Sequence, residues 1–249
     1  MNSTRRIIII GATSAIAEHC ARLWAQAGPV ELVLVARDVG RTERIAADLR
    51  VRGPQARVSV LASDFEDPAA IERTVEAAFG ERADLVLIAH GMLPDQGACE
   101  QDIHACRQAL EINAISPVLF AEACARRMAV RNHGTIALIG SVAGDRGRKS
   151  NYVYGAAKGL VDRYAQGMRH RFAGSGVKVV LIKPGPTDTP MTAHLKGRGA
   201  KLAPVEAVAA SIVRGIDAGQ AVLYVPGKWR VIMLIIRHLP AFVFNKMNI

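Results

Sequence analysis

The chain has 249 residues, half of them hydrophobic and 22% charged, which fits one α/β domain and excludes a disulfide-rich or disordered chain. The longest aliphatic run near its C-terminus spans residues 231–236, far short of the ~18 residues that cross a bilayer, so no transmembrane helix is expected. The net charge of +10 lies in the C-terminal half, because residues 141–249 hold 17 basic and 5 acidic side chains. A surface of this kind attracts phosphates or anionic lipid.

Seven short runs of β-branched and aliphatic residues alternate with segments that have helical spacing. We expect strands at Ile7–Ile10, Leu32–Val35, Val58–Leu61, Leu85–Ala89, Thr135–Ile139, Val177–Ile182 and Ala221–Val225. We expect helices near Ile16–Ala27, Thr42–Arg52, Pro68–Phe79, Asp102–Arg131, Tyr152–Phe172 and Pro204–Ala218. Strands that each lead into a crossover build a sheet buried on both faces, so the predicted fold class is α/β, a doubly wound, Rossmann-type parallel sheet of seven strands.

The chain from 1 to 249 is expected to be a single domain, because it contains no repeat, low-complexity block or Pro/Gly linker. Residues 186–203 form a long irregular stretch after the sixth strand and are predicted to be a mobile substrate lid. Residues 229–249 form an apolar, basic C-terminal tail. The four cysteines lack Cys-x-x-Cys spacing, which predicts reduced thiols, no metal site and a cytoplasmic protein.

The turn after the first strand has the composition of a phosphate-binding turn. In doubly wound folds ligands sit at the carboxyl ends of the strands, and this turn reads Gly11-Ala-Thr-Ser-Ala-Ile-Ala17. Gly11 permits a sharp turn, and the following helix would present free N–H groups to a pyrophosphate. The common pattern has glycine at positions 15 and 17, where this chain has alanine, and an ordinary βα turn is the alternative.

The end of the second strand indicates which dinucleotide is bound. It reads Ala36-Arg37-Asp38, whereas NAD-binding proteins usually place an acid at the tip of this strand. An arginine suits a ribose 2′-phosphate, so NADPH is the preferred cofactor, with Thr13, Ser14 and Arg37 near that phosphate. NAD stays possible, because Arg37 can also be a solvated surface charge and Asp38 can bind the 2′-hydroxyl.

Two further strand ends supply candidate cofactor contacts. Asp64, just after the third strand, can accept a hydrogen bond from an adenine amine, or it can cap the turn before Pro68. After the fourth strand, Ala89-His90-Gly91 provides small residues for a cofactor floor.

A tyrosine and a lysine four residues apart form the candidate catalytic pair. Tyr154 and Lys158 share one face at the start of a helix, and a nearby cation lowers the pKa of a phenol from its usual value of about 10. Ser141, at the end of the fifth strand, would hold a carbonyl beside the phenol. Asn113 opens the expected long helix and would fix a water. Tyr152 lacks a lysine four residues later and is interpreted as a pocket wall or a core aromatic.

The chain resembles the short-chain dehydrogenase/reductase family over nearly its whole length, through the Gly11 turn, Asp64, His90-Gly91, Asn113, Ser141, Tyr154-x-x-x-Lys158 and Pro184-Gly-Pro-Thr-Asp-Thr-Pro-Met191. The resemblance implies that Tyr154 is the general acid in carbonyl reduction, that Lys158 lowers its pKa and that Asn113 anchors a proton-relay water. The implied cofactor contacts are Gly11, Thr13, Ser14, Ile16, Arg37, Asp64, Ala89, His90, Gly91, Tyr154, Lys158, Pro184, Gly185, Thr187 and Thr189. His90 departs from the family, which usually has asparagine or alanine there.

Residues 89–96, 141–154 and 229–240 resemble a narrower group, the decaprenylphosphoryl-2-keto-pentose reductase-like members of this family. That resemblance implies a polyprenyl-phosphate-linked keto-sugar as substrate. Arg146, Arg148 and Lys149 lie between Ser141 and Tyr154 and would clamp its phosphate, unless they are merely a solvated basic loop. The alternatives are a reductase of a soluble carbonyl, such as a 3-ketoacyl thioester, steroid or sugar, and a non-catalytic NADP-sensing protein.

The tail from 229 to 249 has three possible partners. Arg230 and Arg237 are seven residues apart, as are His238 and Asn245, which leaves a wide apolar face between them. This face can rest on the anionic inner face of the membrane, pack against a second subunit or cover the pocket. Self-association as a dimer or tetramer is expected, and nucleic acid is not, because no binding module or aromatic-basic interleaving is present.

Overall fold

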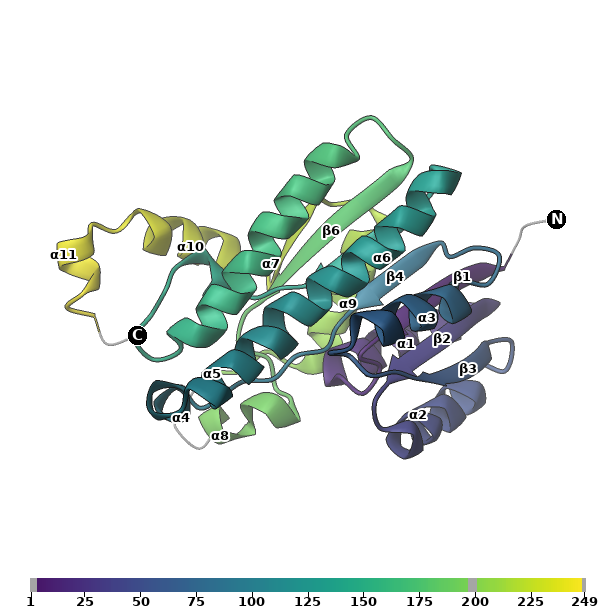
Figure 1. The fold of residues 1–249 in the computed structure, drawn as a ribbon, viewed down its shortest axis with the longest axis horizontal. Coiled ribbons are helices and arrows are strands. Elements are labelled where there is room, and N and C mark those ends of the chain that lie inside the picture. Colours follow the sequence, from purple (N-terminus) through teal and green to yellow (C-terminus); the bar gives the residue numbers. More distant parts are fainter. Residues whose placement is uncertain (1–3, 197–200, 248–249) are drawn as a thin grey trace.

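The computed structural model describes residues 4–196 and 201–247, which form a parallel sheet with helices on both faces (Figure 1). The strands run in the order β3-β2-β1-β4-β5-β6-β7. Their bounds are β1 (Arg5–Ile10), β2 (Val30–Ala36), β3 (Arg57–Ala62), β4 (Leu85–Ile88), β5 (Gly134–Ile139), β6 (Val177–Pro184) and β7 (Val222–Val225). The expected seven-stranded parallel sheet is confirmed, and the strand order reverses between β1 and β4, where such folds form a ligand crevice.

The helices that cover the sheet follow the expected order. Their bounds are α1 (Ala15–Gln26), α2 (Val39–Arg52), α3 (Pro68–Phe79), α4 (Gln96–Gln101), α5 (Ile103–Leu110), α6 (Ser116–Arg131), α7 (Tyr152–Arg171), α8 (Ala193–Lys196), α9 (Val205–Asp217), α10 (Lys228–His238) and α11 (Ala241–Phe244). Three short turns complete the list: the π-helical η1 (Glu111–Ile115) and the 3₁₀ turns η2 (Val142–Asp145) and η3 (Pro190–Thr192).

Strand β1 explains why the sheet has two cores. Its side chains alternate between faces, so Ile7 and Ile9 pack with α1, α2 and α9, whereas Ile8 and Ile10 pack with α3, α6 and α7. All four isoleucines are almost fully buried, and burying a side chain of this size stabilises the fold by about 1.5–3 kcal/mol. An uninterrupted apolar run is therefore what a central parallel strand requires.

Two expectations about the elements were wrong in detail. The edge strand β3 is not buried on both faces, because only β2 pairs with it and its Ser59 and Ala62 are exposed. The single helix expected from Asp102 to Arg131 is α5, η1 and α6, with Asp102 as the N-cap of α5. The π turn is one residue wider than an α-helical turn and rotates the following helix.

The segment between β6 and α9 is more ordered than an irregular loop. It contains η3 and α8, and Thr187 forms a parallel bridge with Ala203. The predicted lid covers 186–203, of which 197–200 lie outside the described residues, as do 248 and 249 of the tail. Mobility of this lid stays a prediction.

The tail forms two helices that project away from the sheet. Figure 1 shows α10 and α11 in yellow at one end of the molecule, separated by Pro240. None of the described helices is long and apolar enough to cross a membrane. The four cysteines are free thiols, and Cys106 is half-buried whereas the other three are buried.

Candidate active site

The turn between β1 and α1 forms one wall of a cavity at the carboxyl ends of the strands. Gly11 has φ +84°, and a side-chain carbon there would lie 2.5 Å from the backbone nitrogen of His90, so glycine is required. Helix α1 begins after Ser14 without a side-chain cap, which leaves its first N–H groups available to an anion. Ala17 is fully buried in the core and Ala15 lines the cavity, so both methyl groups are accommodated.

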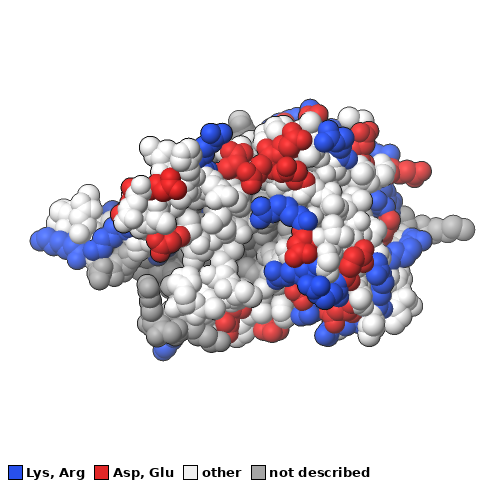
Figure 2. All heavy atoms as spheres, turned by 60° about the horizontal axis from the view of Figure 1, so that its bottom comes forward, with Lys and Arg blue, Asp and Glu red and all other residues white. Residues whose placement is uncertain are grey.

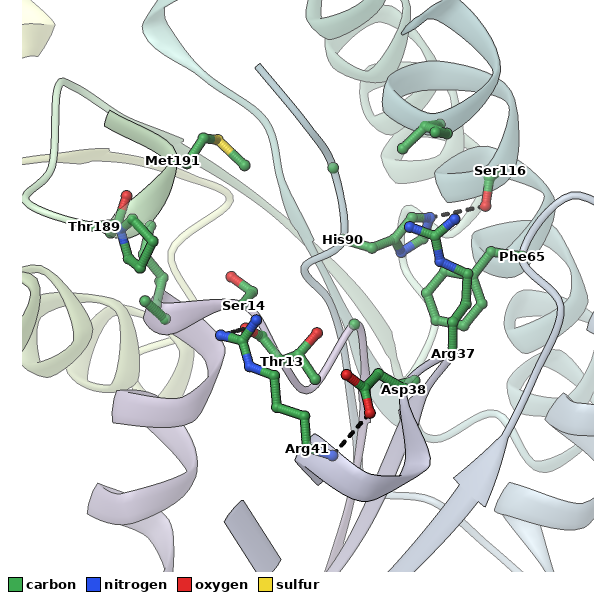
Figure 3. A pocket seen from close by; sticks show the side chains of 17 residues that line it. Thr13, Ser14, Arg37, Asp38, Arg41, Phe65, His90, Ser116, Thr189 and Met191 are labelled. Carbon is green, nitrogen blue, oxygen red and sulfur yellow. Dashed lines mark hydrogen bonds between the residues drawn. The ribbon is translucent and has the colours of Figure 1, made fainter. Parts of the chain in front are cut away.

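This first cavity has a volume of about 400 Å³. Figure 3 shows Arg41 beside Thr13 and Ser14, Arg37 beside His90, and Asp38 between the two arginines. Arg41 donates to the Thr13 carbonyl at 3.0 Å, and the Asp38 carboxylate accepts from the Arg41 N–H at 2.8 Å. Of the residues expected at the cofactor, those that line this cavity are Gly11, Thr13, Ser14, Ile16, Arg37, His90, Gly91 and Thr189.

Arg41 is a functional candidate that the sequence analysis missed. It stands in the first turn of α2, directly after the strand end that carries Arg37. The sequence feature that could have identified Arg41 is its position as a second arginine close to the end of the second strand. Basic side chains border the hollow on this face of the molecule (Figure 2). Two guanidinium groups and the carboxylate of Asp38, which caps α2, therefore lie at this strand end.

Asp64 does not line the cavity, contrary to expectation. Its carboxylate accepts a hydrogen bond from the Glu66 N–H at 2.9 Å and is exposed, which is the turn role that was its alternative. The adjacent Phe65 is buried and takes the place beside the cavity. The turn directs the side chains of Asp64 and Phe65 to opposite sides, so Phe65 lines the cavity and Asp64 faces solvent.

His90 is held as a neutral, half-buried side chain. Its Nε2 is 2.8 Å from Ser116 Oγ, and its ring packs edge-on against Phe65 and Phe120. Burial, followed by the charges of Lys158 and Arg37, lowers the pKa of His90 to about 3. The neighbouring Ala89 is part of the core and does not line the cavity.

Ser141, Tyr154 and Lys158 come together at the end of β5 and the start of α7. Ser141 Oγ accepts from the Ala143 N–H at 3.1 Å and is hydrogen-bonded to the Tyr154 side chain. Lys158 Nζ donates to the Ile139 carbonyl at 3.1 Å and lies 5.8 Å from the centre of the Tyr154 ring. Tyr152 is 46% exposed and lines neither cavity, so its interpretation as a pocket wall or core aromatic is wrong.

The pKa of Tyr154 differs from the expectation. Burial raises the pKa of Tyr154, and the hydrogen bond from Ser141 only partly opposes this effect. Burial also lowers the pKa of Lys158, to about 8. The expected lowering of the Tyr154 pKa by Lys158 is therefore not seen, since desolvation of both groups dominates.

Asn113 is buried within η1 and does not open a helix. Its Nδ2 donates to the Ala109 carbonyl and its Oδ1 accepts from the Met92 N–H, both at 2.9 Å. A carbon added to Gly91 would lie 2.9 Å from Asn113 Oδ1 and 3.6 Å from Lys158 Nζ, so these two groups border the same space. Asn113 therefore lies in a π turn, a local helix geometry that is frequent at functional sites.

A second cavity of about 290 Å³ adjoins the first. It is lined by Ser141 and Tyr154, and Ile16 and Thr189 line both cavities. The remaining expected cofactor contacts, Pro184, Gly185 and Thr187, line this second cavity only. Trp229, at the start of α10, forms part of its wall and packs on Gly185, where an added carbon would lie 1.9 Å from Trp229 Nε1. Trp229 was expected only as part of the tail.

The three cations between Ser141 and Tyr154 do not act as one clamp. Arg146 donates to the carbonyls of Ile236 and Leu239 at 2.5 and 2.7 Å, and its guanidinium lies 3.8 Å from the centre of the Phe244 ring. Lys149 is exposed and does not line the second cavity, whereas Arg148 does. The expected clamp is wrong for Arg146, because carbonyls at the end of α10 bind its guanidinium.

A buried ion-pair network supports η2, the turn that follows Ser141, and was not expected from the sequence. Lys183 of β6 pairs with Asp145 of η2 and Asp162 of α7, and the Tyr224 hydroxyl donates to Asp145 at 3.0 Å. Burial opposes the charge on Lys183, but the two carboxylates raise its pKa above the usual value. The signal in the sequence was a lysine inside an apolar strand, which needs a partner when buried.

Comparison with known proteins gives consistent matches. The sequence matches the family described as short chain dehydrogenase over residues 5–198. An uncharacterised oxidoreductase of Streptomyces coelicolor is 31% identical, covering 98% of this chain and 96% of its own length. The cis-4-hydroxycyclohexanecarboxylate dehydrogenase of Sinomonas cyclohexanicum is 31% identical over 77% of this chain and 76% of its own. A solved short-chain dehydrogenase from Sphingobium yanoikuyae in complex with NADPH aligns with a TM-score of 0.82 at 25% identity, covering 98% of this chain and 96% of that chain.

Proposed function

The chain belongs to the short-chain dehydrogenase/reductase family, and from this premise we propose that it reduces a carbonyl group to an alcohol with NADPH. It is an oxidoreductase with a nicotinamide-binding fold. The observation that carries the proposed reaction is that Ser141 and Tyr154 line the second cavity, which adjoins the first, while the buried Lys158 lies 5.8 Å from the centre of the Tyr154 ring. Reaction in the opposite direction uses the same residues, and the relative from Sinomonas cyclohexanicum is named for the dehydrogenation of a hydroxyl compound.

The first cavity fits a dinucleotide. Its uncapped helix start, its close-packed Gly11 turn and its two arginines match a pyrophosphate and an additional phosphate. We assign the 2′-phosphate of NADPH to Arg37 and Arg41, since Asp38 is occupied as the N-cap of α2. When bound, the cofactor supplies the hydride.

The protein's own residues supply the proton. Tyr154, whose pKa is raised by burial, is protonated at neutral pH and donates its proton to the carbonyl oxygen. Ser141 orients that oxygen through its hydroxyl. Lys158, with a pKa of about 8, stabilises the phenolate that forms and returns a proton to it through the polar space shared with Asn113.

Replacing Tyr154 tests this mechanism. Tyr154→Phe removes the proton donor and little volume, so we expect kcat to fall by at least about 100-fold while the NADPH dissociation constant stays within two-fold. The matched control is Tyr152→Phe, which removes the same atom from an exposed ring and is expected to be mild. The readouts are NADPH absorbance with a panel of ketones and a fluorescence titration of NADPH.

The same comparison separates the enzyme from a cofactor sensor. A sensor would bind NADPH and turn over no ketone in the wild-type protein, and Tyr154→Phe would then change nothing. If Tyr152→Phe were the inactive variant, the assignment of the acid would be wrong.

For the substrate, the tail supports a membrane-associated carbonyl compound such as the polyprenyl-phosphate-linked keto-sugar. Residues 228–249 contain four basic and no acidic residues, and α10 and α11 expose large apolar side chains next to the basic ones. Figure 2 shows basic and uncharged atoms at the projecting end of the molecule. An anionic lipid surface complements this charge, whereas a second copy of the same segment would repel it. Trp229 connects α10 to the second cavity, so the substrate would enter near the lipid.

A soluble carbonyl compound is the alternative substrate, and it would leave the tail without a lipid partner. Assembly into a dimer or tetramer stays a prediction from the family, measurable by analytical ultracentrifugation.

A further inference from the structure

Arg148 is the only charged side chain among the described residues that line the second cavity. Its Nε is shielded from solvent and has no hydrogen-bond partner, and none of the ion pairs between described residues involves it. Burial lowers the pKa of Arg148, with no carboxylate to compensate. A guanidinium in this position gains free energy when an anion binds to it.

The two neighbouring cations do not share this position. Arg146 is held by the carbonyls of Ile236 and Leu239, and Lys149 is exposed to solvent. The catalytic loop therefore presents one positive charge to the cavity, and that charge is Arg148.

A second polar atom in the same cavity is also unpaired. Asn151 Oδ1 is shielded and has no hydrogen-bond partner among the described residues, and Asn151 lines the cavity together with Arg148. Buried polar atoms in folded proteins are nearly always paired. The pair suits a ligand with an oxyanion for the guanidinium and a hydroxyl or N–H donor for the amide oxygen.

Resting on the carbonyl reductase function above, we propose that the substrate carries a carboxylate or phosphate group that Arg148 binds while its carbonyl oxygen meets Ser141 and Tyr154. All three side chains line one cavity of about 290 Å³, so a single small molecule reaches both ends. Arg148 thereby determines specificity for anionic ketones, and Asn151 accepts a hydrogen bond from a donor next to the anion.

The test uses pairs of ketones that differ in charge. Levulinate is compared with methyl levulinate, and dihydroxyacetone phosphate with dihydroxyacetone, using wild-type protein, Arg148→Met and Lys149→Met. Lys149→Met is the matched control, because it removes one positive charge from the same loop outside the cavity. We expect Arg148→Met to raise KM about ten-fold or more for the charged member of the preferred pair and less than three-fold for the neutral member. Whichever pair of ketones the enzyme prefers shows whether the anionic group of the substrate is a carboxylate or a phosphate.

A binding measurement keeps this test independent of turnover. Trp229 lies in the cavity wall, so titration of each anion in saturating NADP⁺ is followed by tryptophan fluorescence. Saturable binding that Arg148→Met abolishes and Lys149→Met preserves supports the anion site, even if no ketone is reduced and the proposed function fails. Reduction of neutral ketones with equal effects of Arg148→Met on both members of each pair, or no saturable binding of either anion, would overturn the anion site.

Discussion

Removing the charge of Lys183 should destabilise the protein more than removing any exposed cation. The Lys183 and Asp145 side chains are 3% and 1% exposed, and Asp162 is 15% exposed. Lys183→Met leaves two buried carboxylates without their cation. Removing one partner of a buried ion pair typically costs about 3–5 kcal/mol, so we expect a loss in this range.

The matched control is the exposed pair of Arg126 and Glu72, whose side chains are 58% and 62% exposed. Arg126→Met should cost less than about 1 kcal/mol, because solvent screens that pair. The free energy of unfolding is measured by urea denaturation at pH 7, followed by circular dichroism.

A triple variant separates charge from packing in this network. Adding Asp145→Asn and Asp162→Asn to Lys183→Met removes the uncompensated charges, so it should recover more than half of the lost stability. The reasoning is refuted if Lys183→Met costs less than about 1 kcal/mol, or if the triple variant is no more stable than the single one.

Two predictions concern the cofactor and the tail. Replacing Arg37 and Arg41 together by alanine should raise the NADPH dissociation constant about ten-fold or more and leave that of NADH within two-fold, as measured by fluorescence titration. Arg44→Ala, on the same helix but outside the cavity, is the control, and an equal loss for both cofactors would contradict the assignment. Leu234→Glu should reduce sedimentation with anionic liposomes several-fold at low salt without changing NADPH binding. Val130→Glu, at a more exposed apolar position on α6, should not reduce it, and a wild-type protein that does not sediment with such liposomes would exclude the membrane contact.

Features that depend on neighbouring residues in the chain could be predicted from the sequence. The apolar runs located all seven strands, because a central strand buried between two helical layers must be apolar on both faces, and the edge strand β3 keeps an apolar run although part of it is exposed. The four-residue spacing of Tyr154 and Lys158 predicted that both lie on one face of a helix, which is α7. Gly11 indicated the cofactor turn, because a sharp turn at positive φ requires glycine.

The roles of the charged side chains could not be predicted, because each depends on a partner far away in the sequence. Arg146 and Arg148 are two residues apart and basic, yet one binds carbonyls of residues 236 and 239 and the other lines the substrate cavity. Lys183 is charged inside the core because η2 and α7 bring two carboxylates to it.

The sequence alone therefore determined the sheet, the order of its elements and the proximity of Tyr154 and Lys158 on one helix, since these follow from local spacing and from burial of apolar residues. The tertiary structure decided which cations face the substrate, which one holds the tail and which supports η2. The physical reason is that a long charged side chain is directed by whichever acceptor or anion the folded chain brings within reach, and its own neighbours in the sequence do not specify that partner.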